Sequence, residues 1–236
     1  MRHAVIVTAA GSSSRFNNSL DSHSDSLGVK KEFIKVQDET ILSKAIKPFL
    51  LVDDLVAVVV TYKEEFFDET IDCLRQINIP EKIKSFLVKG GATRQESVFN
   101  ALQFLDEEVK DLDLVSIHDG ARPFITKALI ENCLEVAAEV GGAVPALPMS
   151  DTLVKVENGK IIGSLDRAKF FNVQTPQTFR FPEIYKAHLA ARNKANDGLI
   201  YTDDTQIFTD YGLEVAIVKG DPNNKKITYP RDLEKL

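Results

Sequence analysis

The segment AVIVTAAGSSSRF (residues 4–16) decides the fold of this chain. It begins with a nearly continuous apolar run and then turns, at a glycine, into a stretch rich in serine that ends near an arginine. Strands buried on both faces have this composition, and such burial is typical of parallel sheets covered by helices. A glycine at the carboxyl end of such a strand lets backbone N–H groups approach an anion. We therefore expect a central strand over 4–10 that leads into an anion-binding loop.

Similar apolar runs recur along the rest of the chain, which predicts further buried strands. They cover residues 55–62, 84–90, 114–119, 141–147 and 213–220. Amphipathic segments that predict helices lie between them, at 39–52, 94–105 and 126–140. Because strands and helices alternate, we expect an α/β fold with a doubly wound, mostly parallel sheet, built as a single domain over residues 1–236.

Two segments depart from this alternation. Residues 17–28 (NNSLDSHSDSLG) are polar and non-periodic, which predicts a mobile loop directly after the first glycine turn. Residues 152–168 contain two alternating runs around Asn158-Gly159, a dipeptide that suits a tight hairpin turn. A two-stranded arm that projects from a sheet is marginally stable alone. We therefore expect this arm to pack on a second copy of the chain in a homodimer.

The composition argues against several classes of protein. Of the 236 residues, 44% are hydrophobic and 27% are charged, which is ordinary for one globular domain with a sizeable core. The net charge of -6 argues against a nucleic-acid partner, because phosphate backbones are bound mainly by clustered Lys and Arg. A phosphorylated substrate would therefore need positive charge that is concentrated at one site.

The sequence also bears on location. Cys73 and Cys133 each lie in a periodic apolar stretch, and we interpret them as buried, reduced thiols. The N-terminal stretch has no signal-peptide pattern, and no window approaches the roughly 18 apolar residues of a membrane span. We expect a cytoplasmic protein without a membrane partner.

Two glycine-containing turns are candidates for nucleotide binding. The first contains Gly11 and is followed by Arg15 and by the pair Lys30-Lys31, but it matches neither the dinucleotide fingerprint nor the P-loop pattern. The second, KGGATRQESV (89–98), has paired glycines that permit close approach of a base or ribose to the backbone. Taken alone, the first loop is better explained by a glycine that only turns the chain, and the second is equally well an ordinary strand-to-helix turn.

A third motif, VSIHDGARPF (115–124), brings His118, Asp119 and Arg122 to the carboxyl end of a predicted strand. An aspartate beside phosphate loops is a reasonable Mg²⁺ ligand, since this ion is usually held by one or two carboxylates plus substrate phosphates. An aspartate that only caps the turn and pairs with Arg122 is an equal alternative. We interpret His118 as structural, because no nucleophile lies near it in the sequence.

Together these segments resemble the 2-C-methyl-D-erythritol 4-phosphate cytidylyltransferases of non-mevalonate isoprenoid synthesis. The resemblance covers nearly the whole chain. It rests on the ordered set AAGSSSRF, KKEF, GGATRQESV, HDGARPF, SDT, DR, TPQTF, TDD and NNKKIT. This set is specific for the wider group of sugar-alcohol-phosphate cytidylyltransferases and separates its members less well.

The resemblance implies a Rossmann-like nucleotidyltransferase with an assigned role for each motif. It places CTP against Ala9, Ala10, Gly11, Gly91, Ser97 and Asp119. It gives charge stabilisation at the phosphates to Arg15, Lys31 and Lys226, and the divalent cation, Mg²⁺ or another, to Asp119. It assigns the acceptor, a sugar-alcohol phosphate, to Asp151, Thr152, Arg167 and Thr175.

The implied reaction is attack by the acceptor phosphate on the α-phosphorus of CTP, which transfers CMP and releases pyrophosphate. A ribitol 5-phosphate cytidylyltransferase and a noncatalytic nucleotide-binding protein on the same scaffold are the alternatives. The family usually has Pro-Lys-Gln where this chain has Lys30-Lys31-Glu32, so Lys30 competes with Lys31 for the first lysine role. Lys225 competes with Lys226 in the same way.

Overall fold

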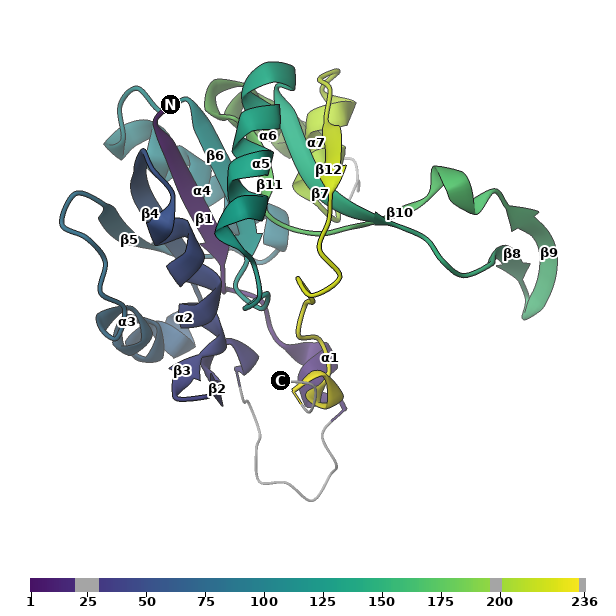
Figure 1. Ribbon diagram of the computed structural model, residues 1–236, viewed down its shortest axis with the longest axis horizontal. Helices are drawn as coiled ribbons and strands as arrows, with labels where there is room; N and C mark the ends of the chain where they lie inside the picture. Colours follow the sequence, from purple (N-terminus) through teal and green to yellow (C-terminus); the bar gives the residue numbers. More distant parts are fainter. Residues whose placement is uncertain (20–29, 196–200, 234–236) are drawn as a thin grey trace.

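The computed structural model describes residues 1–19, 30–195 and 201–233, and it shows a layered α/β body from which a long arm extends (Figure 1). Within these residues, eight strands form one sheet in the order β10-β7-β11-β6-β1-β4-β5, with β12 paired to β7. The strands are β1 (His3–Thr8), β4 (Leu55–Tyr62), β5 (Lys84–Lys89), β6 (Leu114–Asp119), β7 (Gly142–Pro148), β10 (Phe171–Val173), β11 (Gln177–Arg180) and β12 (Ala216–Lys219).

The sheet is parallel at its centre. Strand β1 pairs in parallel with β4 and β6, β4 with β5, and β12 with β7, whereas β10 and β11 run antiparallel to their neighbours. Because β1, β4, β5 and β6 are parallel, their carboxyl ends meet at one edge, and the loops that follow them gather there. The predicted doubly wound, mostly parallel sheet is confirmed.

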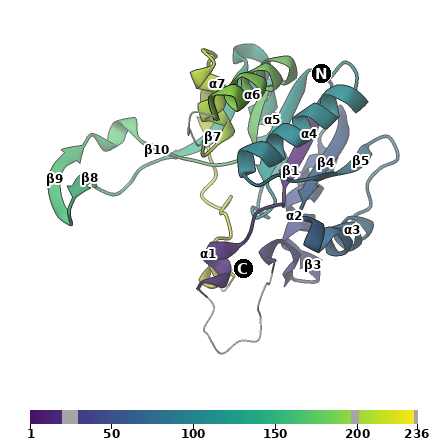
Figure 2. The same cartoon turned by 180° about the vertical axis from the view of Figure 1, so that it is seen from behind.

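Helices cover both faces of the sheet. Along β1, Val5 and Val7 pack into one buried cluster, and Ala4 and Ile6 pack into another on the opposite face. The first cluster is completed by α2 (Ile41–Ile46), α3 (Phe67–Arg75) and α5 (Lys127–Val140). The second contains α4 (Arg94–Glu108), α6 (Phe181–Ala195) and α7 (Asp204–Asp210), which stand in front in Figure 2.

The helices begin where the sequence supplies caps. The hydroxyl of Thr126 accepts a hydrogen bond from Leu129 N at 3.3 Å, and α5 ends before Gly141, whose φ is 114°. Both ends match the sequence prediction. The predicted helix over 39–52 is instead split into α2 and a 3₁₀ turn, η2 (Lys47–Leu51). Pro48 accounts for the change, because it has no N–H to continue the α-helical pattern.

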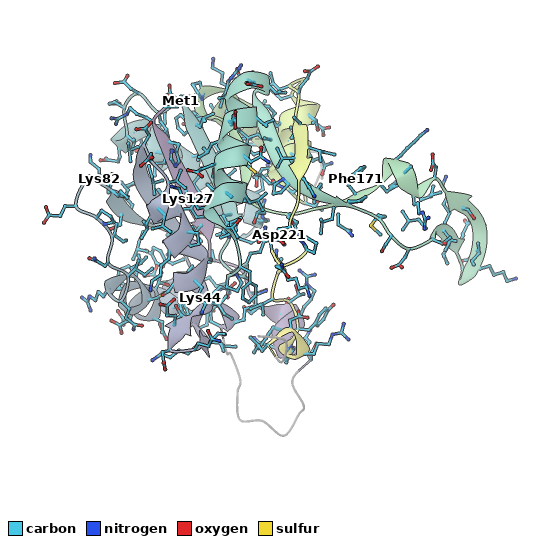
Figure 3. The ribbon with its side chains drawn as sticks, viewed as in Figure 1. Met1, Lys44, Lys82, Lys127, Phe171 and Asp221 are labelled. Atoms are coloured by element: carbon cyan, nitrogen blue, oxygen red, sulfur yellow. The ribbon has the colours of Figure 1, made fainter. Side chains whose placement is uncertain are left out.

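The predicted hairpin forms the arm that extends from the body (Figure 1). Strands β8 (Leu153–Glu157) and β9 (Lys160–Leu165) pair in antiparallel fashion around Asn158 and Gly159, whose φ values are 50° and 74°. Both residues therefore adopt the left-handed conformation that a two-residue type I′ turn requires. The 3₁₀ turn η4 (Arg167–Lys169) and β10 lead back to the sheet, and Phe171 lies near the base of the arm (Figure 3).

A third, smaller cluster of buried side chains joins the N-terminal and C-terminal segments. Helix α1 (Ser14–Asn17) lies beside the C-terminal 3₁₀ turn η5 (Pro230–Asp232), with Phe16 and Ile227 buried against Ile41. The turns η1 (Lys31–Phe33) and η3 (Glu64–Phe66) and the short hairpin β2 (Lys35–Val36) and β3 (Glu39–Thr40) complete the described elements. Of the predicted polar loop, residues 20–28 lie outside the described residues.

Candidate active site

A cleft of about 420 Å³ opens at the edge where β1, β4, β5 and β6 end, a size within the ~300–1,000 Å³ usual for small-molecule sites. Its wall contains all three motifs singled out in the sequence. The charged residues that line it are Arg15, Lys31, Lys63, Arg94 and Lys226 on the positive side and Glu32 and Asp119 on the negative side. The protein as a whole is acidic, so this cleft concentrates the positive charge that a polyanionic ligand needs.

The first loop follows β1 into the cleft. Ala10 and Gly11 line the cleft, whereas Ala9 lies buried beneath it and donates its N–H to Thr61 O at 3.2 Å. The loop packs directly on the second glycine turn, because a Cβ atom on Gly90 would lie 2.3 Å from Ala10 Cβ. A glycine is therefore required at position 90 for the two loops to meet.

The second turn joins β5 to α4 and presents Gly91 and Ser97 to the cleft. Thr93 caps the helix by accepting a hydrogen bond from Glu96 N at 3.1 Å. Ser97 Oγ donates to Thr93 O at 2.9 Å and accepts from Gly91 N at 3.0 Å. The Ser97 hydroxyl thus fixes the backbone of the turn whose surface faces the cleft.

Asp119 lies at the centre of a cluster of cations at the end of β6. Its Oδ2 lies 2.8 Å from Lys226 Nζ and 3.5 Å from Arg122 Nε. Burial alone would raise the pKa of this carboxyl, but Lys226, Arg94 and Arg122 hold the pKa well below its usual range. Asp119 is therefore ionised, and it holds the ammonium of Lys226 at the cleft wall.

Each of two lysine pairs has one member in the cleft. Lys31 lines the cleft and donates from Nζ to Ile227 O at 2.7 Å, and Lys226 lines it as the partner of Asp119. Neither Lys30 nor Lys225 lines the cleft. Burial lowers the pKa of Lys31, although the nearby Glu32 opposes this effect.

Two of the cleft cations, Arg15 and Lys226, are each followed in the sequence by a buried apolar residue that anchors the backbone. Arg15 precedes Phe16, which is 2% exposed, and Lys226 precedes Ile227, which is 1% exposed. Ile227 N donates to Ala121 O at 2.8 Å, which ties the C-terminal segment to the loop after β6. The two anchors pack in one small cluster, so the loop of Arg15 and the segment of Lys226 are held together at the cleft.

Arg94 connects the cleft to a buried polar network. Its Nη1 lies 2.7 Å from Oδ2 of Asp204, which is fully buried, and His188 Nε2 lies 3.1 Å from the other carboxylate oxygen. Asp204 N donates to Gln177 Oε1 at 3.0 Å. Burial raises the pKa of Asp204, but Arg94 and His188 together more than offset it, so the pKa lies below its usual value.

His118 and Thr175 lie behind the cleft. Thr175 Oγ1 lies 3.0 Å from His118 Nδ1 and accepts a hydrogen bond from Asp119 N at 3.1 Å. His118 is fully buried, and burial lowers its pKa to about 4. A neutral imidazole of this kind supports the backbone of Asp119, as expected for a structural histidine.

The comparisons with known proteins agree with this geometry. The family model for 2-C-methyl-D-erythritol 4-phosphate cytidylyltransferase matches residues 3–235. The chain belongs to this family. It is 34% identical to the cytidylyltransferase of that name from Bacillus licheniformis, over 99% of this chain and 93% of the relative. It is 37% identical to the one from Clostridium acetobutylicum, over 98% and 94% of the two chains.

Solved structures of this cytidylyltransferase family share the fold. The enzyme from Thermus thermophilus superimposes with a TM-score of 0.71 at 31% identity, covering 98% of this chain and 95% of that one. The 4-diphosphocytidyl-2C-methyl-D-erythritol synthase from Anaerococcus prevotii superimposes with a TM-score of 0.81, covering 99% and 93% of the chains. At 24% identity, the second comparison supports the fold alone.

Three of the four residues that the family resemblance assigns to the acceptor site lie away from the cleft. Asp151, Thr152 and Arg167 are exposed where the arm joins the body, and Arg167 Nη1 donates to Ser150 O at 2.7 Å. None of the three lines the cleft, and Thr175 lies behind it. Within one chain, the structure therefore brings the nucleotide residues together but not the acceptor residues.

Only part of a metal site is built by side chains. No group of three or more His, Cys, Asp or Glu residues suitable for a metal ion occurs in the described part of the chain. Asp119 is nonetheless an ionised carboxylate on the cleft wall, and Mg²⁺ can be held by one carboxylate when substrate phosphates supply further oxygens. The residues present fit an ion that arrives with a nucleotide.

Sequence reasoning missed several residues of the cleft of this cytidylyltransferase. Arg94 stands in the quoted motif GGATRQESV, but its role depends on Asp204, which is 110 positions away. Lys63 and Glu32 also line the cleft. The one available signal was the position of each residue directly after a predicted strand or beside a quoted lysine.

No helix in the described ranges combines the length and the hydropathy that crossing a bilayer requires.

Proposed function

We propose that this enzyme transfers CMP from CTP to 2-C-methyl-D-erythritol 4-phosphate and releases pyrophosphate, using the cleft at the carboxyl edge of the sheet. The single observation that carries the proposal is the convergence of Arg15, Lys31 and Lys226 on a cleft that also contains the glycine turn at Gly91. The identities of the nucleotide and of the acceptor are inferred from family membership. The positive charges of the cleft complement the negative charge of a triphosphate.

The two loops divide the nucleotide between them. In this proposal cytosine and ribose lie against the turn of Gly91 and Ser97, and the triphosphate lies against Ala10 and Gly11, with Ala9 supporting that loop from below. A phosphate oxygen of the acceptor attacks the α-phosphorus in line with the departing pyrophosphate. The acceptor phosphate is already ionised near neutral pH, so no strong general base is needed.

The basic residues lower the barrier by neutralising charge. Arg15, Lys31 and Lys226 converge on the phosphates from separate segments, so their charges are in place before the reaction begins. Asp119 holds Lys226 in position and would hold Mg²⁺ through its carboxylate. A bound Mg²⁺ contributes further charge neutralisation and orientation of the triphosphate.

The acceptor site is proposed to need a second copy of the chain. Asp151, Thr152 and Arg167 lie on the arm, away from the cleft of their own chain. The arm exposes Val156, Ile161 and Ile162, each more than half exposed, and such apolar side chains favour burial in an interface. A two-fold dimer would cover them and could place the acceptor residues beside a cleft.

We also propose that the enzyme acts in the cytoplasm, where its nucleotide substrate CTP is made. Its two cysteines, Cys73 and Cys133, are free and buried, which is compatible with a reducing compartment.

A panel of acceptors tests the assignment. Pyrophosphate release from CTP is measured with methylerythritol 4-phosphate, ribitol 5-phosphate and glycerol 3-phosphate, and kcat/KM is compared. The proposal expects the first to be preferred by at least about tenfold, a difference of about 1.4 kcal/mol in transition-state binding. Preference for ribitol 5-phosphate would reassign the acceptor, and CTP binding without release for any acceptor would indicate a noncatalytic protein.

A further inference from the structure

A buried ion pair joins the first nucleotide loop, at Gly11 and Ser13, to residues 30–32. Lys30 and Glu32 flank Lys31, and their side chains are 2% and 6% exposed. Lys30 Nζ lies 3.6 Å from Glu32 Oε2 and donates to Gly11 O. Glu32 Oε2 also accepts a hydrogen bond from Ser13 Oγ at 3.2 Å. The pair therefore contacts the loop at two residues, Gly11 at its turn and Ser13.

The three consecutive residues have different surroundings. Lys31 and Glu32 both line the cleft, whereas Lys30 does not. Lys30 instead lies behind it, with Nζ 5.8 Å from the centre of the Phe66 ring. Lys30 cannot contact a ligand in the cleft from this position. Any effect of Lys30 on the ligand has to act through Glu32 or through the loop.

The cleft wall thus contains the carboxylate of Glu32, which would repel a triphosphate. A buried charge without a partner is costly, and an unpaired negative charge beside phosphates repels them. Lys30 is the only cation with which Glu32 forms an ion pair among the described residues. Burial lowers the pKa of Lys30 and Lys63 lowers it further, whereas Glu32 and Glu65 oppose that change and favour the charged ammonium.

We propose that Lys30 is a positioning residue for the nucleotide: it binds Gly11 O, neutralises Glu32 from behind the cleft and keeps that side chain on Ser13, which allows the cleft to accept a triphosphate. This inference rests on the proposed function only for the identity of the ligand as CTP. It explains why two adjacent lysines have separate roles. Lys31 faces the ligand, and Lys30 compensates the acid at the next position.

The decisive experiment is a double-variant cycle on the full-length protein. CTP and CMP affinities are measured by isothermal titration calorimetry for Lys30→Met, Glu32→Gln and the combined variant. Lys30→Met should weaken CTP binding by about tenfold or more, because it leaves Glu32 unpaired. In the Glu32→Gln background the same change should cost less than about threefold, because no carboxylate remains to be neutralised.

A comparison of ligands of different charge distinguishes repulsion by Glu32 from a general defect in the loop. Lys30→Met should weaken CTP binding by a larger factor than CMP binding, since repulsion by Glu32 grows with the number of phosphates. Lys30→Arg, which keeps the charge, should lose less CTP affinity than Lys30→Met. Equal losses for CTP and CMP, or an equal loss in both backgrounds at position 32, would overturn the proposal.

Two controls keep the result interpretable. Lys127→Met removes a lysine whose partner, Glu131, lies 3.4 Å away on the surface of α5, and it should leave both affinities unchanged (Figure 3). If Lys30→Met alone fails to fold, the combined variant decides: CTP affinity near the wild-type value supports the proposal, and a tenfold loss contradicts it. Binding is measured without an acceptor, so a protein that binds CTP but transfers nothing would reject the proposed function and still test this inference.

Discussion

Replacing Lys226 with alanine is the perturbation that separates chemistry from binding most clearly. Lys226 Nζ lies 2.8 Å from Asp119 Oδ2 at the cleft wall, on a segment fixed by the buried Ile227. The change Lys226→Ala removes one preorganised positive charge from the phosphate region. It also removes a main cation that lowers the pKa of Asp119, with Arg94 and Arg122 remaining.

The size of the effect follows from the surroundings of the lysine. Loss of one preorganised charge-stabilising donor typically costs about 10²–10³ in kcat, or about 2.7–4 kcal/mol. The Lys226 side chain is 34% exposed, so water can partly replace it, and two arginines remain near Asp119. We therefore expect the lower end of that range, a fall in kcat of about 100-fold, with the KM for CTP changing much less.

Steady-state pyrophosphate release at saturating acceptor measures both constants. Lys225→Ala is the matched control, because Lys225 is the exposed neighbour that does not line the cleft, and it should keep kcat within about twofold. A near-normal kcat for Lys226→Ala, together with a large loss for Lys225→Ala, would show that the role has been given to the wrong lysine.

The remaining predictions concern the metal, the arm and stability. EDTA should abolish turnover, and Asp119→Asn should raise the Mg²⁺ concentration for half-maximal rate; an unchanged metal titration would leave Asp119 a turn residue. Replacing residues 155–163 by Gly-Gly should give a monomer in sedimentation with a raised acceptor KM and little change in CTP affinity, whereas a fully active monomeric wild type would refute the role of the arm. His3 and His118 are buried with pKa values that burial lowers to about 4, so the unfolded chain binds more protons below about pH 6.5. The free energy of unfolding in urea should therefore fall by roughly 2 kcal/mol per histidine from pH 7 to pH 5, and His3→Gln should remove about half of that dependence.

The parts of the fold that the sequence predicted have a simple physical signature. Strands β1, β4 and β6 are buried on both faces, so their residues are apolar with few interruptions. The hairpin was recognisable because Asn158 and Gly159 both adopt positive φ, which few other residue pairs do readily.

Strands β10 and β11 were not predicted, and the residues of β11 explain why that strand was missed. Gln177 and Thr178 are buried but polar, and each is satisfied by a distant partner: Gln177 accepts from Asp204 N, and Thr178 Oγ1 lies 2.9 Å from Ser116 Oγ. A polar pair of this kind looks like a loop when only the sequence is read. Strand β12 begins at Ala216 rather than at 213, after a turn in which Gly212 has a φ of 92°.

The residues of the site also fall into a group that the sequence predicted and a group that it did not. Motifs directly after strands could be placed in one cleft, because parallel strands end at one edge of the sheet. The pairing of Arg94 with Asp204 could not be inferred, since it depends on how α4 and α7 meet on one face of the sheet. The separate surroundings of Lys30 and Lys31 likewise depend on the 3₁₀ turn η1, whose direction no local pattern reveals.

The proposed reaction forms a CMP adduct of methylerythritol 4-phosphate, and ³¹P NMR of the reaction mixture detects that adduct directly. With CTP, Mg²⁺ and 2-C-methyl-D-erythritol 4-phosphate, we expect the acceptor phosphate signal to be replaced by two mutually coupled phosphorus signals of a new diphosphate, in step with the appearance of pyrophosphate. Unchanged acceptor and CTP signals after prolonged incubation with the folded protein, or release of CMP without a new diphosphate, would contradict it.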